Sequence, residues 1–207
     1  MLINAWHPAQ ANWSPIEEAL TVRWPFTTHL RDLVQMLRQL ANHVPRDVVD
    51  RLVPTLRALM TSPPNQLHGN PDVRRAATMA LASLRPQEFS DRDLWNLLSG
   101  DTGQRGAAAW VVTVRDGGAQ ALPVLAALIN DADVEVRAIV AACLSRLAVD
   151  GDNRRQAREL LVQILADSGT LVARIAAERL SNAPDNDPQL LELLRNHISA
   201  QVRQNVR

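Results

Sequence analysis

Residues 130–147, NDADVEVRAIVAACLSRL, combine a tight turn with a helix that has one apolar face. Asp133 is a suitable N-cap, because its carboxylate can accept a hydrogen bond from a backbone N–H that the first helical turn leaves free. Glu135 adds negative charge near the positive end of the helix dipole. The stretch therefore predicts an amphipathic helix. The apolar residues that recur at three- and four-residue steps are Val136, Ile139, Val140, Cys143, Leu144 and Leu147.

The rest of the chain from about residue 70 repeats this pattern in edited copies. Residue types that favour a helix start recur at steps of about 30 to 36 positions, which is typical of helical repeat proteins. These candidate N-caps are Asn70, Asp101, Asp133, Gly169 and Ser199. Four positions after them stand Arg74, Arg105, Arg137, Ala173 and Arg203.

Residues 70–81, NPDVRRAATMAL, resemble the second-helix signature of the HEAT-repeat family, and residues 104–108 and 136–137 repeat it more loosely. The resemblance covers about two thirds of the chain and implies an all-α, right-handed α-α superhelix of about five helical pairs. It also implies a polar ladder between successive repeats, which Ala173 interrupts. The acids of that ladder would be Asp72, Asp101, Asp131 or Asp133, and their partners Arg74, Arg105, Arg137 and Arg203.

Two regions are expected. Residues 1–69 read as divergent N-terminal capping helices, with a capping box at residues 14–17 and apolar stripes within residues 28–42 and 48–59. Residues 70–207 read as HEAT-like repeats, the last of them incomplete, because the chain stops about two turns into the helix that Ser199 begins. That ending favours a piece of a longer protein, or a solenoid completed by a partner.

Charge and composition limit the possible partners. The 22 basic residues balance 22 acidic ones, so no net field attracts nucleic acid or an anionic membrane. A single cysteine excludes an intramolecular disulfide. The N-terminus lacks a leader pattern, and no apolar run reaches membrane-spanning length. The sequence therefore predicts a soluble cytoplasmic protein.

The known catalytic motifs are missing. The chain has no glycine-rich phosphate loop, no paired-cysteine motif and no His-Glu-x-x-His, and its five histidines are scattered without ligand spacing. Cys143 lies on an apolar helix face, where a small apolar side chain is expected. The paired acids stand at helix starts, where capping explains them. We therefore predict no catalytic residue, no metal site and no cofactor.

The helix columns opposite the apolar face are the candidate binding surface. Helical geometry places the fifth, ninth and twelfth positions after each N-cap on that side. Met79 and Trp110 share one column of adjacent repeats and would suit a contact point for a partner helix or strand. The alternative is that Trp110 packs against a neighbouring helix. The candidate partner-binding residues are Arg75, Met79, Trp110, Thr113, Arg174 and Glu178.

Three functions are compatible with this pattern. The favoured one is a non-catalytic scaffold that binds a protein or peptide on its concave face. The second is a regulatory or sensor segment of a larger multidomain protein. The third is an enzyme built on a related fold, such as a HEAT-like DNA glycosylase or bilin lyase. Neutral charge and an aromatic content of 3% disfavour a DNA groove.

Overall fold

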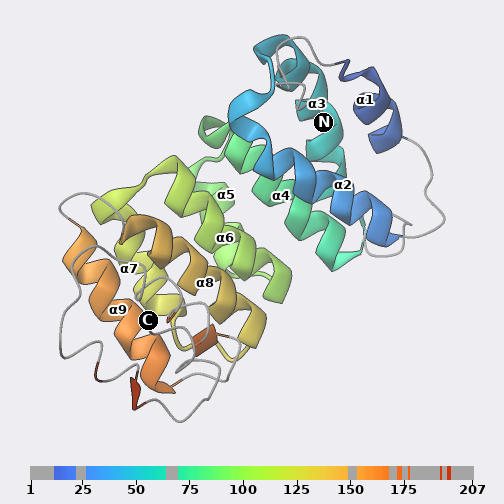
Figure 1. Cartoon of the computed structure of the whole chain (residues 1–207). Coiled ribbons are helices and arrows are strands. Elements are labelled where there is room, and N and C mark those ends of the chain that lie inside the picture. Colours follow the sequence, from blue (N-terminus) through green and yellow to red (C-terminus); the bar gives the residue numbers. More distant parts are fainter. Residues whose placement is uncertain are drawn as a thin grey trace. The chain divides into compact units, whose positions relative to one another are not determined.

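The computed structural model describes residues 12–21, 27–63, 70–148 and 153–167, together with single residues between 172 and 196. The regular elements in these ranges are α-helices and short 3-10 turns (Figure 1). The chain divides into two compact units, Met1–Ala107 and Ala108–Arg207, and each is described by itself. The all-helical fold class expected from the sequence is confirmed.

The described part of the first unit is built from helices packed against one another. Helix α4 packs against both α2 and α3, and α1 contacts the same two helices. Figure 1 shows α2 and α4 side by side. The helices are α1 (Ser14–Thr21), α2 (Thr27–Gln39), α3 (Arg46–Met60), α4 (Pro71–Leu84), α5 (Asp91–Leu98) and the start of α6 (Thr102–Arg115).

The second unit contains the rest of α6 and three further described helices. Helix α8 packs against α7 and α9, and α7 also contacts α9. A turn at Gly117 separates α6 from α7; its φ of 62° lies in the left-handed region that glycine adopts without strain. The additional helices are α7 (Gly118–Leu128), α8 (Val134–Leu147) and α9 (Arg154–Asp167).

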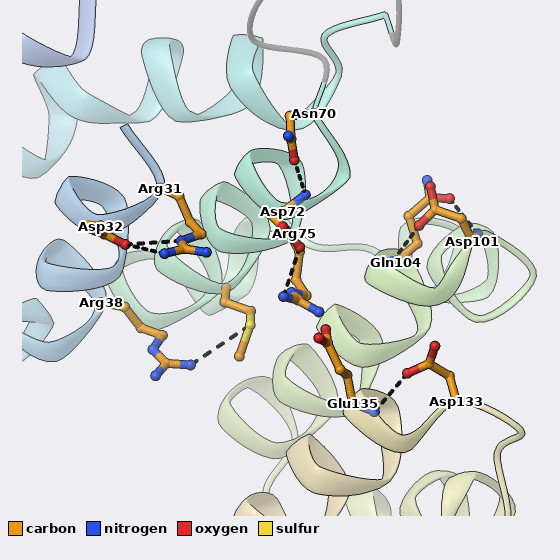
Figure 2. A network of polar contacts seen from close by, with 11 residues as sticks. Arg31, Asp32, Arg38, Asn70, Asp72, Arg75, Asp101, Gln104, Asp133 and Glu135 are labelled. Carbon is orange, nitrogen blue, oxygen red and sulfur yellow. Dashed lines mark hydrogen bonds and ion pairs between the residues drawn. The ribbon is translucent and has the colours of Figure 1, made fainter. Parts of the chain in front are cut away.

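The predicted helix starts at Asn70, Asp101 and Asp133 are confirmed. The side chain of Asn70 accepts a hydrogen bond from the backbone N–H of Asp72 at 2.8 Å, and Asp133 accepts one from Glu135 at 2.7 Å (Figure 2). Asp101 and Gln104 cap α6 reciprocally, since each side chain accepts the other's backbone N–H at 2.9 Å. The remaining candidate caps, Gly169 and Ser199, lie outside the described residues.

The start of α1 was placed correctly, but Glu17 has a different role from the one predicted. Helix α1 begins at Ser14, whose backbone N–H donates to Asn12 Oδ1 at 3.1 Å. Both carboxylate oxygens of Glu17 accept hydrogen bonds from Arg51 of α3 at about 3 Å. Glu17 therefore links α1 to α3.

A complete capping box stands at the start of α5. The Ser90 hydroxyl accepts the backbone N–H of Asp93 at 3.2 Å, and Asp93 Oδ2 accepts the backbone N–H of Ser90 at 2.9 Å. Two donors that the first turn would leave free are thus satisfied. This box fixes where an eight-residue helix begins.

Helix α4 is buried on every side over residues 76–82. Four of these seven residues are alanine, and such small side chains let α2 and α3 approach the axis of α4 closely. Thr78 is also buried, because its hydroxyl donates to the carbonyl of Arg74 at 2.8 Å. The centre of the first unit is therefore a covered helix.

The polar ladder implied by the resemblance appears between Arg74 and Asp101, whose Nη2 and Oδ2 atoms are 2.9 Å apart. The equivalent arginines also reach the turns before their own helices. Arg105 Nη1 donates to the carbonyl of Gly100 at 3.1 Å, and Arg137 Nη1 donates to that of Asp131 at 2.6 Å. The acceptors in these two contacts are backbone carbonyls. Arg203 lies outside the described residues.

Candidate binding site

The first unit contains a hollow of about 290 Å³. It is lined mainly by the ends and starts of successive helices. Its walls come from the C-terminal end of α3, the first turns of α4, the side of α5 and the start of α6. Met60, Phe89 and Leu97 supply apolar wall, and Phe89 and Leu97 are buried in the fold. Pro71 adds a further apolar side chain, and the remaining lining is polar or charged. A hollow of this size matches one large side chain or a small ligand.

The Arg74–Asp101 pair, which joins α4 to the turn before α6, belongs to the wall of the hollow. The arginine side chain is 18% exposed and the aspartate side chain 42%. Within the described residues, the guanidinium makes this one hydrogen bond, and its buried Nε has no acceptor. An arginine carries five donors, so most of the hydrogen-bonding capacity of Arg74 is unused.

Arg75 also lines the hollow and is held by Asp72 one turn earlier in α4. The two side chains meet at 3.0 Å (Figure 2). Here too the aspartate is the more exposed partner. Both arginines of the hollow are therefore more shielded from water than the acids that pair with them.

Two further side chains bring polar groups to the hollow from α5 and α6. Gln104 uses its Oε1 for the cap of α6, and its Nε2 makes no hydrogen bond to the described residues. Asp93 is held by the hydroxyl and the backbone N–H of Ser90, and these bonds, with the charges of Arg57 and Arg92, lower the pKa of its carboxyl. Asp93 is thus ionised and a weak base at neutral pH.

Gly103 permits a close approach between the start of α6 and the first turns of α4. A Cβ at this position would lie 3.3 Å from the carbonyl oxygen of Pro71 and 3.6 Å from Arg75 Cβ. The start of α6 therefore sits against the first turns of α4. A side chain at residue 103 would push the two helices apart.

The structure corrects the expected exposure of two candidate binding residues. Met79 is only 5% exposed, and its sulfur accepts a hydrogen bond from Arg38 of α2 at 3.8 Å. Thr113 is 4% exposed, and its hydroxyl donates to the carbonyl of Ala109 at 2.7 Å. Met79 is covered because α4 packs against two helices, while Thr113 tolerates burial because its hydroxyl is satisfied within α6.

The other candidate residues fall in different places. Arg75 lines the hollow of the first unit. Trp110 belongs to the second unit and is half-buried, with the guanidinium carbon of Arg146 in α8 5.9 Å from its ring centroid. This distance is within the range of a cation–π contact. Arg174 and Glu178 lie outside the described residues.

Sequence reasoning missed Trp95, which is 70% exposed on α5. The available signal was its position beside the stripe of Leu94, Leu97 and Leu98, which turns the indole away from the packed side. Asn96, the next residue and about 100° further around the helix, lines the hollow. Helix α5 therefore carries an exposed aromatic ring on a different side from Asp93, Asn96 and Leu97, which line the hollow.

Other kinds of site find no support in the described part of the chain. No group of three or more histidine, cysteine, aspartate or glutamate residues there could hold a metal ion. No helix in these ranges has the length and apolar character needed to cross a membrane.

Comparison with known proteins gives a structural likeness without a sequence relative. No protein-family model and no curated protein matches the chain. Among solved structures, a designed armadillo repeat protein in complex with the peptide (KR)4 is similar, with a TM-score of 0.52 and 16% sequence identity. The match covers 94% of this chain and 96% of that one. Together with the packed helical pairs and their equivalent N-caps, this likeness shows that the chain has the fold of a helical-repeat solenoid protein.

Proposed function

We propose that this protein is a non-catalytic scaffold of the HEAT type that binds a protein or peptide partner. The observations that carry the proposal are an exposed tryptophan, Trp95, and a hollow, both on the first helical unit. Tryptophan is enriched among residues that dominate binding energy. Helix α5 contributes both the exposed ring and part of the lining of the hollow.

The structural likeness supports this proposal at the level of the fold. The similar armadillo repeat protein is a helical scaffold in complex with a peptide. A rigid stack of helices needs little rearrangement to accept an extended or helical segment, so less of the interaction energy is lost to ordering. The same mode of use is proposed for this chain.

The carboxylates at the hollow favour binding over catalysis. Asp101 caps α6 and pairs with Arg74, and Asp93 caps α5 with its pKa lowered. A general base works best with a pKa near the operating pH, which requires a raised carboxyl pKa. Asp93 therefore serves the start of α5.

The proposed domain boundaries, cellular location and further partner contacts follow the sequence pattern. Residues 1–69 would form the N-terminal cap and residues 70–207 the repeats, in a cytoplasmic protein. Arg75 in the first unit and Trp110 in the second are proposed as further partner contacts.

Selection of displayed peptides on the full chain tests the proposal. Random 12-residue peptides would be selected against the protein, and the affinities of the enriched sequences measured by fluorescence polarisation. Because Trp95 is exposed, Trp95→Ala should weaken binding by about tenfold or more while leaving the melting temperature nearly unchanged.

Val134→Ala is the matched control, since Val134 is exposed and apolar but lies outside α5. It should leave the affinity unchanged. Failure to enrich any peptide, or equal binding by Trp95→Ala, contradicts the proposed function. Binding of a labelled DNA duplex that weakens steeply with salt would instead indicate a nucleic-acid-binding protein.

A further inference from the structure

The hollow of the first unit combines an apolar wall with an arginine that makes few of its possible hydrogen bonds. Met60, Phe89 and Leu97 form the apolar wall, and Arg74 carries a guanidinium that makes one hydrogen bond within the described residues. An apolar stem that ends in a hydrogen-bond acceptor would satisfy both parts of this surface.

The formal charges that line the hollow cancel, but their environments differ. Arg74 and Arg75 oppose Asp93 and Asp101. The arginine of the Arg74–Asp101 pair is the more buried partner, and Arg75 stands in the same relation to Asp72. Charges with less water around them are screened less, so the two arginines are screened less than the acids that pair with them.

The acids that line the hollow are already occupied by donors. Asp101 Oδ1 accepts the backbone N–H of Gln104, and its Oδ2 accepts Arg74. Asp93 Oδ2 accepts both the hydroxyl and the backbone N–H of Ser90. The unused groups therefore include the remaining guanidinium donors of Arg74 and the Nε2 of Gln104, whose Oε1 is engaged by Asp101.

From this arrangement we propose that the hollow receives a glutamate side chain of the partner, with its carboxylate bound by Arg74 and its methylene stem against the apolar wall. The inference rests on the proposed function and names the chemistry that the hollow selects. Arginine binds carboxylates through its planar fork of donors, and a charge-assisted bond of this kind is stronger than a neutral one. The hollow has a volume of about 290 Å³, which has room for the side chain of glutamate, whose stem is one methylene longer than that of aspartate.

The test uses small probes and the full chain. N-acetyl-L-glutamate amide, whose backbone carboxylate is blocked, would be titrated at neutral pH and low salt, and the NMR signals of the Gln104 and Asn96 side-chain amides followed. The shifts should saturate. N-acetyl-L-glutamine amide, which has the same length without the charge, should bind about tenfold more weakly or worse.

Two variants give opposite expected changes. Arg74→Gln should abolish the saturable shifts, whereas Arg85→Gln should not, because Arg85 is ion-paired to Asp50 and does not line the hollow. Asp101→Asn should strengthen binding of the glutamate probe, since asparagine can still cap α6 but no longer competes for Arg74. This variant keeps the test decisive even if Arg74→Gln lowers stability.

Several outcomes would overturn the proposal. Equal binding of the glutamine probe would remove the need for charge, and weaker glutamate binding by Asp101→Asn would mean that Arg74 does not hold the carboxylate. Tighter binding of N-acetylglycine would assign the hollow to a chain-terminal carboxylate. In each case, selected peptides that still depend on Trp95 would leave the proposed function standing.

Discussion

At the scale of single residues, helix caps are the features that the sequence predicts best. Asn70 and Asp133 cap α4 and α8 as their chemistry suggests. A short polar side chain just before a run of regularly spaced apolar residues has few local hydrogen-bonding roles other than capping the helix. Side chains that act at a distance are harder to assign. Glu17 has the spacing of a capping box, yet it bonds to Arg51, 34 positions later. Local spacing contains no information about α3.

The capping box of α5 makes a prediction about acid titration. Hydrogen bonds from Ser90 lower the pKa of Asp93, so the folded carboxyl should titrate below its ordinary value of about 3.9. Its stabilising contribution is present above that ordinary value and is lost as the pH falls through the lowered pKa. Ser90→Ala should raise the pKa toward the ordinary value, as followed by carboxyl carbon NMR. An unchanged pKa in this variant would contradict the proposed cause.

At the scale of elements, periodicity located the helices but underestimated how many sides of α4 are covered. The apolar stripe of residues 48–59 lies within α3. A period of three and four residues identifies one apolar face. It does not show that alanines on the other sides of α4 admit a second helix, and Met79 was therefore assigned to the surface.

Replacing Met79 tests this burial. Met79→Ala should lower the free energy of unfolding by about 2 to 4 kcal/mol, because it leaves a cavity between α4 and α2. Urea denaturation measures the change. Trp95→Ala is the exposed comparison and should change the stability by less than about 0.5 kcal/mol. Equal small effects of both variants would return Met79 to the surface.

At the scale of the whole molecule, the solenoid fold was predictable and the candidate site was not. Equivalent N-caps at Asn70, Asp101 and Asp133 repeat along the chain, so a period search finds the fold. The hollow draws its lining from residues 60 to 104, across three turns. Its position depends on how neighbouring helical pairs stack, and a pattern read within one repeat does not contain that information.

The central claim is that successive helical pairs stack in register, with the start of α6 pressed against the start of α4. The Gly103→Leu substitution tests this claim, because helix propensity and stacking predict changes of opposite sign in the free energy of unfolding. Helix propensity alone would make Gly103→Leu more stable, by up to about 1 kcal/mol. The Cβ alone would lie 3.3 Å from Asp101 Oδ1 and from the Pro71 carbonyl oxygen, so a leucine side chain would force its neighbours to move.

The deciding measurement is therefore the free energy of unfolding of Gly103→Leu in urea. Stacking predicts a decrease of about 1 to 3 kcal/mol. An increase would mean that α6 begins with free space around residue 103, and the stacked arrangement of the two helices would be contradicted.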